Sequence, residues 1–185
     1  MSEELKISAQ ITPNPNTLKF VLNHTLIASG SIDFSNPEKA QTSPLPKALF
    51  AIEGVSGVMV GINFVSVSKT NQIDWAALAE PITDTLKATI TEGATLIDES
   101  LLQNAQNTDS SEIENRIKEI LDTEIRPAVA MDGGDITFYG YEDGVVSLHL
   151  QGACSSCPSS TITLKMGIEN RLREEFPEII EVIQV

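Results

Sequence analysis

A chain of 185 residues with 41% hydrophobic residues is long enough for one large or two small globular domains. Its formal net charge of −14 repels phosphate backbones and anionic membrane surfaces, and no apolar run approaches the length of a membrane span. We therefore expect neither a nucleic-acid-binding nor a membrane protein. The first residues, Met1-Ser2-Glu3-Glu4-Leu5-Lys6, carry no signal for export or transit, which predicts a cytoplasmic protein.

Residues 1–91 have the pattern of a small α+β domain. Alternating apolar residues on both sides of Thr12-Pro13-Asn14-Pro15-Asn16 predict a β-hairpin, because this cluster is rich in turn formers. Pro81 is expected to kink or restart the helix that contains it. The expected elements, in chain order, are strands within 5–11, 18–22 and 26–34, a helix from Ser43-Pro44, strands at 58–60 and 64–67, and a helix over 74–90.

Residues 92–110 differ from what precedes them. They contain four acidic and no basic residues, and their second half is polar without any period. We predict an acidic linker that is flexible in its second half, with Leu96, Ile97, Leu101 and Leu102 in a brief helix or a docking patch.

Residues 111–185 are expected to form a second small domain. Ser111 and Glu114 match a capping box, and the apolar stripe that follows predicts a helix stopped by Arg126-Pro127. Asp143-Gly144 is a strong signal for a hairpin between two strands. A helix over 160–176 and a strand over 179–185 follow. The fold class is therefore α+β with two small domains, and the C-terminal domain has the order helix-strand-strand-helix-strand.

The chain's two cysteines lie in Gly152-Ala153-Cys154-Ser155-Ser156-Cys157-Pro158, between a predicted strand and a predicted helix. The positive end of a helix dipole lowers a thiol pKa and favours bound negative charge. Structural zinc sites and iron–sulfur clusters usually need four ligands, so a metal site here requires two chains that each give two thiols. The alternative without metal is a dithiol–disulfide redox centre.

Other candidate residues favour structural roles. Asp132 and Asp135 flank two glycines, and this segment predicts a tight turn rather than a hard-cation site. His149 is expected to be an ordinary strand residue rather than a fifth ligand. Gly167, inside the last helix, is expected to mark close packing against the sheet, because glycine costs about 1 kcal/mol against alanine in a helix.

Several stretches of the chain together match a known family. In the second domain they are Arg126-Pro127-Ala128-Val129, Met131-Asp132-Gly133-Gly134-Asp135-Ile136, the cysteine motif and Met166-Gly167-Ile168-Glu169, with Pro177 downstream. In the first domain they are Thr12 to Phe20, Leu49-Phe50, Gly54-Val55 and Asp74-Trp75. By these stretches the second domain resembles the NifU-like C-terminal domain of the Nfu iron–sulfur scaffold and carrier proteins, and the first resembles the Nfu N-terminal domain. Together the two resemblances cover most of the chain except the linker.

The resemblance implies a non-enzymatic carrier in which Cys154 and Cys157 of each subunit ligate one 4Fe–4S cluster bridged between two subunits. It implies a homodimer when the cluster is loaded, cluster-assembly proteins as donors, and apo iron–sulfur proteins as acceptors. Hydroxyl or N–H donors to the cluster are expected from Ser155, Ser156, Ser159 and Ser160. Two other functions stay open. One is a thiol–disulfide oxidoreductase, disfavoured by the small domain and by the lack of a complete βαβ pattern around the cysteines. The other is a zinc-bridged interaction module.

Overall fold

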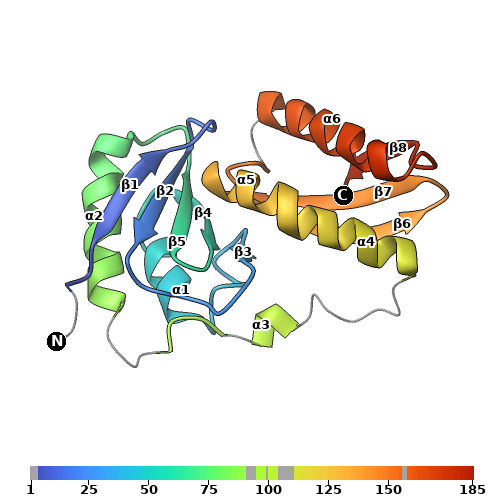
Figure 1. The fold of residues 1–185 in the computed structure, drawn as a ribbon. Coiled ribbons are helices and arrows are strands. Elements are labelled where there is room, and N and C mark those ends of the chain that lie inside the picture. Colours follow the sequence, from blue (N-terminus) through green and yellow to red (C-terminus); the bar gives the residue numbers. More distant parts are fainter. Residues whose placement is uncertain (1–3, 91–94, 99, 104–110, 156–157) are drawn as a thin grey trace. The chain divides into compact units, whose positions relative to one another are not determined.

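The computed structural model describes residues 4–90, 95–98, 100–103, 111–155 and 158–185, with the side chains of residues 102, 103 and 158–160 left out. The chain divides into two compact units, Met1–Gln106 and Asn107–Val185, and each has its own hydrophobic core. The predicted α+β class with two small domains is confirmed (Figure 1). The boundaries at 91 and 111 stay predictions. Within the described residues, no helix combines the length and the apolar character needed to cross a membrane.

The first unit is built on a five-stranded antiparallel sheet with the order β1-β2-β5-β4-β3. The two predicted strand pairs, β1 with β2 and β4 with β5, are confirmed. The strand expected over 26–34 is shorter than predicted, and Gly30, with φ of 74°, precedes it in the left-handed region. The strands are β1 (Ile7–Ile11), β2 (Thr17–Leu22), β3 (Ile32–Phe34), β4 (Val55–Val60) and β5 (Phe64–Lys69).

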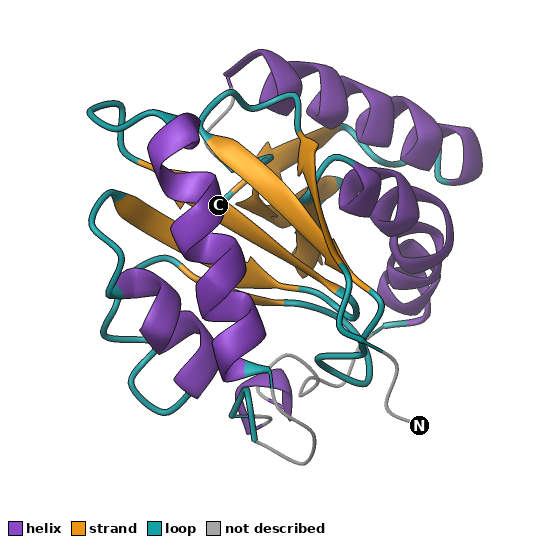
Figure 2. Ribbon diagram, turned by 90° about the vertical axis from the view of Figure 1, so that its left-hand side faces the viewer, coloured by secondary structure: helices purple, strands orange, loops and turns teal. Residues whose placement is uncertain are grey.

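Helices α1 (Pro44–Phe50) and α2 (Trp75–Thr89) lie on the same face of this sheet (Figure 2). Their buried leucines and isoleucines, such as Leu49 and Ile82, pack against the strands. α2 runs through Pro81 as one helix, so the predicted restart is wrong. Pro81 lies on the exposed side of α2, where water can bond the carbonyl that lacks an N–H partner.

The first part of the predicted linker packs onto the first unit. Leu96 and Ile97 are buried in its core, and the Asp98 N–H donates to the Ser43 hydroxyl at 3.0 Å. The short helix α3 (Ser100–Gln103) contains Leu101 and Leu102 of the predicted brief helix, whereas Leu96 and Ile97 precede it. Residues 104–110, where flexibility was predicted, lie outside the described residues.

The second unit begins with a helix that is longer than predicted. The capping box is confirmed, because the Ser111 N–H donates to Glu114 at 2.7 Å and the Glu114 N–H donates to the Ser111 hydroxyl at 3.4 Å. The predicted stop at Arg126-Pro127 is wrong, and α4 (Glu112–Ile120) continues through a π-helical segment, η1 (Leu121–Ile125), into α5 (Arg126–Met131). The Arg126 N–H bonds the Leu121 carbonyl five residues back, and Pro127 then sits in the first turn of α5, where no donor is needed.

The sheet of the second unit has the order β6-β7-β8. β6 (Gly134–Glu142) and β7 (Val145–Gly152) are joined by Asp143-Gly144, whose φ values of 48° and 83° are those of a type I′ turn. After the cysteine motif, α6 (Pro158–Glu175) leads to β8 (Glu181–Gln184), which runs parallel to β7. The predicted order of elements is confirmed, but β7-α6-β8 is a complete βαβ unit around the cysteine motif. The expectation that this pattern is missing is therefore wrong.

One face of this sheet is covered by the two long helices (Figure 1). Val146, Leu148 and Leu150 alternate along β7 toward the core, and Ile117 of α4 and Leu172 of α6 are buried against it. Gly167 of α6 does not have the predicted close packing, because a Cβ built on it meets nothing within 4 Å. The presence of a glycine at this position of α6 therefore has another cause.

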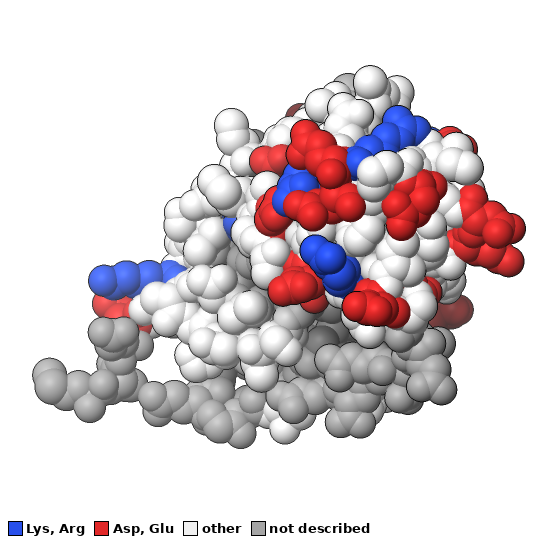
Figure 3. Space-filling view, turned by 45° about the vertical axis from the view of Figure 1, so that its right-hand side comes forward, with Lys and Arg blue, Asp and Glu red and all other residues white. Residues whose placement is uncertain are grey.

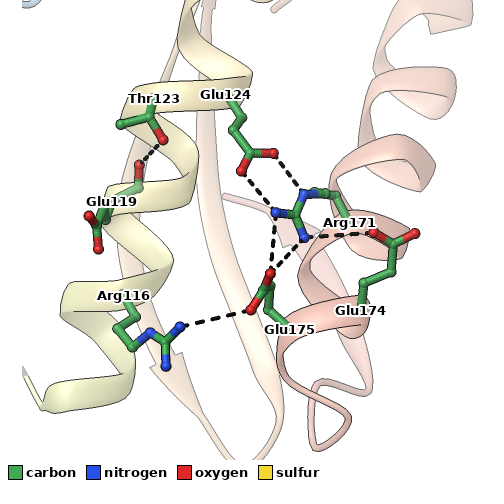
Figure 4. Close-up of polar contacts among 7 residues, drawn as sticks. All are labelled: Arg116, Glu119, Thr123, Glu124, Arg171, Glu174 and Glu175. Atoms are coloured by element: carbon green, nitrogen blue, oxygen red, sulfur yellow. Dashed lines mark hydrogen bonds and ion pairs between the residues drawn. The ribbon is translucent and has the colours of Figure 1, made fainter.

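Ion pairs connect the helices on the surface of the second unit, where acidic and basic side chains interleave (Figure 3). Arg171 of α6 donates to both carboxylate oxygens of Glu124 of η1 at 2.7 and 2.8 Å, and also to Glu175 at 3.4 Å (Figure 4). Arg116 of α4 lies 3.8 Å from Glu175. Exposed pairs of this kind contribute little individually, and a bidentate contact within a network contributes more.

These contacts predict a pH dependence for Glu124→Gln. Hydrogen bonding by Arg171 holds the pKa of Glu124 below its ordinary value of 4.5, so the contribution of this carboxylate is present above about pH 4.5. It is lost as the pH falls through the lowered pKa. Amide exchange in α6 should be faster in Glu124→Gln than in the native chain at pH 7, and the difference should vanish in strong acid. Glu119→Gln, whose carboxylate points away from Arg171 in Figure 4, is the control and should show no such difference.

Candidate functional site

The structure places Cys154 where the sequence predicted, between the end of β7 at Gly152 and the start of α6 at Pro158. Its side chain belongs to the core of the second unit, and the residue is 4% exposed. Cys157, the second predicted ligand, lies outside the described residues, as does Ser156. The arrangement of strand, cysteine and helix is therefore established for Cys154.

Hydrogen bonds fix the chain on both sides of Cys154. Gly152 has a φ of 63°, and its carbonyl accepts from the Ser155 hydroxyl at 2.9 Å and from the Ser155 N–H at 3.2 Å. The Thr161 hydroxyl, in the first turn of α6, donates to the Cys154 carbonyl at 3.1 Å. Both donors of Ser155 thus serve the turn in this structure, and donation from Ser155 to a cluster stays a prediction. The side chains of Ser159 and Ser160 lie outside the described residues.

The two-glycine turn before β6 lies directly against the cysteine. The Gly133 carbonyl accepts from the Ala153 N–H at 3.2 Å, and Gly133 has a φ of 75°, as predicted for a tight turn. A Cβ built on Gly134 would lie 2.5 Å from the Cys154 sulfur and 3.0 Å from the Cys154 Cβ. Real Cβ atoms essentially never come so close, so only glycine at 134 leaves the sulfur where it is.

A partly buried ion pair holds this turn in place. Arg126 donates from Nε and a terminal nitrogen to the two oxygens of Asp135 at 2.8 and 2.7 Å, and from its other terminal nitrogen to Asp122 at 3.0 Å. The Asp135 side chain is 7% exposed and also accepts from the Ile136 N–H at 2.8 Å. Hydrogen bonding to Asp135, the main cause, holds the pKa of Arg126 above its ordinary value. This geometry is a charge-assisted bidentate pair.

The remaining candidates have structural roles. Because Asp135 is bound by Arg126, the turn interpretation of this segment is favoured over a hard-cation site, and no group of three or more metal-binding side chains occurs among the described residues. His149 Nδ1 lies 2.6 Å from the Val185 carbonyl, as suits a strand residue next to β8.

Sequence reasoning missed Arg126, Gly134 and Asp135 as supports of the cysteine. The available signal was a helical arginine and an aspartate on either side of a Gly-Gly turn. This signal could not be interpreted while the helix was expected to stop at Arg126. Arg126 binds Asp135 only because the helix continues to the turn.

Comparison with known proteins matches both units. The family model described as "Scaffold protein Nfu/NifU N terminal" matches residues 7–93, and the one described as "NifU-like domain" matches residues 117–183. The chain is 45% identical to the human protein named "NFU1 iron-sulfur cluster scaffold homolog, mitochondrial" over 97% of this chain and 71% of that protein. It is 44% identical to "NifU-like protein 5, mitochondrial" of Arabidopsis thaliana over 96% of this chain and 67% of that protein.

Other matches cover a smaller share of the relative or of this chain. The chain spans 64% of the Drosophila erecta protein with the same name as the human one, at 43% identity. Among solved structures, a NifU-like protein from Saccharomyces cerevisiae is 26% identical with a TM-score of 0.48, over 54% of this chain and 91% of that one.

These relatives contradict the expected cytoplasmic location, because they are named as mitochondrial proteins. The expectation rested on the first six residues. The chain spans only 64–71% of the human and Drosophila erecta proteins, so these residues do not report on the compartment.

The contact between Gly134 and Cys154 predicts a specific cost for Gly134→Ala. The added methyl group must displace the sulfur or the strand, which should lower the free energy of unfolding by about 1–3 kcal/mol. Gly140→Ala on the same strand is the matched control, since nothing lies within 4 Å of its Cβ, and it should stay within about 0.5 kcal/mol of the native chain. Hydrogen exchange of β7 amides measures both, and equal effects would contradict the account.

The Arg126–Asp135 pair predicts that Asp135→Asn destabilises the second unit. The variant loses a bidentate bond to a charge, which we expect to cost about 1.5–3 kcal/mol. Asp122→Asn removes the outer contact of the same arginine, where the carboxylate is 58% exposed, and should cost less than about 1 kcal/mol. Denaturant unfolding followed by exchange in β6 and β7 compares the two, and the account fails if Asp122→Asn costs as much as Asp135→Asn.

Proposed function

Because this chain belongs to the Nfu family of iron–sulfur cluster scaffold proteins, we propose that it holds a 4Fe–4S cluster between two copies of itself and transfers it to apo-proteins. The observation that carries the proposal is the cysteine motif. The chain's only two thiols lie at a strand-to-helix junction inside the part that matches the NifU-like domain. What the names of the longer relatives say about those proteins applies to this chain only as part of this proposal.

The number of ligands that a 4Fe–4S cluster needs indicates that two chains take part. A 4Fe–4S cluster takes four thiolates, and one chain supplies Cys154 and Cys157. A second copy therefore completes the ligand set. The cluster with four thiolates is an anion, and the N-terminus of α6, which follows the cysteines at Pro158, supplies positive electrostatic potential and N–H groups toward it.

Burial of Cys154 adds a requirement. At 4% exposure its sulfur has to become accessible before it can ligate a cluster shared with another chain. The backbone on both sides of it is bonded, because the Ala153 N–H donates to the Gly133 carbonyl and the Thr161 hydroxyl donates to the Cys154 carbonyl. Loading of the cluster therefore includes a step that exposes this sulfur.

The proposed role is that of a non-enzymatic carrier. Its cargo arrives from cluster-assembly proteins and leaves to acceptor proteins whose thiols exchange with Cys154 and Cys157. The names of the relatives favour mitochondria as its location.

The two other functions are less well supported. The β7-α6-β8 unit removes one objection to a thiol oxidoreductase, but an attacking thiol must be accessible, and Cys154 is buried. A zinc-bridged module would use the same four thiols without sulfide. The family match supports the iron–sulfur cluster over both.

Anaerobic reconstitution with iron and sulfide tests the proposal. The native chain should bind about four irons and four sulfides per dimer, and Cys157→Ser should bind less than a tenth of that because two of four ligands are lost per dimer. Cys154→Ser should lose the cluster equally and also lose about 1–3 kcal/mol of stability, since it leaves a hydroxyl in the core. Ser155→Ala, whose side chain serves the turn, is the control and should keep most of the cluster. A colourless monomer, or zinc without sulfide, would contradict the proposal.

A further inference from the structure

One face of α6 is exposed and uncharged. Ile162 is 63% exposed and Met166 is 61% exposed, although both are large apolar residues. Thr163, Gly167 and Asn170 lie beside them at helical spacing and are also exposed. We call these five residues the uncharged stripe. It extends for about 12 Å along the helix, at 1.5 Å per residue.

The stripe belongs to a segment that is unusual for this chain. Residues 111–185 contain 14 acidic and 6 basic residues, yet residues 144–168 contain one charged side chain, Lys165. Lys165 is paired with Glu181 of β8 at 3.0 Å. Two copies of such an acidic unit repel each other wherever their charged surfaces meet, and the exposed described residues of this segment let them approach without that repulsion.

Gly167 provides a second indication. Glycine inside a helix costs about 1 kcal/mol against alanine, and apart from the helix's own adjacent backbone none of the described residues comes within 4 Å of the Cβ position of Gly167. Packing inside this unit therefore does not explain it. A helix from another molecule can approach closely at such a position, and the flexible Met166 beside it can adapt to that surface.

The stripe begins one residue after a residue that contacts Cys154. Thr161, next to Ile162, donates to the Cys154 carbonyl and so attaches the first turn of α6 to the cysteine loop. Met131, 76% exposed, lies two residues before Gly133, whose carbonyl accepts from Ala153. Exposed apolar side chains thus flank the cysteine loop on both of its neighbouring elements, α5 and α6.

We propose that the uncharged stripe is the surface on which a second copy of this chain packs, so that the four thiols of two copies meet beside it. The inference rests on the proposed function and adds the face through which the two copies join. The packing is apolar and free of like charges, and it buries Ile162 and Met166, which the single chain leaves in water.

Met166→Glu tests the inference on the full-length chain. It adds a negative charge to the stripe of each copy and should weaken dimer formation by the cluster-loaded protein at least tenfold in sedimentation velocity. Iron and sulfide retained after desalting should fall in parallel. Ile180→Glu is the matched control, because it adds the same charge at an apolar residue that is 65% exposed. Ile180 lies beside Gly144, in the turn between β6 and β7. It should dimerise and retain the cluster like the native chain, and circular dichroism should show all three proteins folded.

The outcomes separate the two proposals. A native chain that dimerises with its cluster while Met166→Glu does so equally well overturns the stripe and leaves the proposed function standing. If Met166→Glu dimerises and loads normally but no longer delivers its cluster to an apo-protein, the stripe contacts acceptors instead, which also overturns the inference. A native chain that binds no cluster contradicts the proposed function, and the stripe proposal fails with it.

Discussion

The contact between the Gly134 backbone and the Cys154 sulfur is the constraint on which the second unit depends. β6 and β7 are adjacent strands of one hairpin, so the turn before β6 lies next to the turn after β7, and this contact sets how closely the two turns approach. Arg126 binds Asp135 next to this contact and attaches it to the long helix. The cysteine is thus held by packing against Gly134, and Asp135, the residue after Gly134, is held by a partly buried ion pair.

Features coded by neighbouring residues were predictable from the sequence. The type I′ turn at Asp143-Gly144 and the capping box at Ser111 depend on residues at most a few positions apart, and both are confirmed. Cys154 was placed correctly because a strand pattern, a cysteine and a helix pattern follow one another in the chain.

Features that depend on distant parts of the chain were not predictable. A proline rule predicted that the helix stops at Arg126, but the π-helical segment lets it continue. The direction of β8 depends on how α6 crosses the sheet, and four residues do not encode it. The Arg126–Asp135 pair could not be found while the helix was expected to end early. Gly167 was expected to pack inward because glycine is costly inside a helix, but its Cβ position faces open space.

The π-helical segment determines the direction of Arg126. One extra residue in a turn rotates everything after it by about 100° relative to an ordinary α-helix. η1 comes immediately before Arg126, so the angular phase of α5 is offset from that of α4. A regular α-helix over the same residues would turn the guanidinium of Arg126 away from Asp135 by about this angle. The π-helical form of this segment is therefore as important to the cysteine site as the identity of the residues that line it.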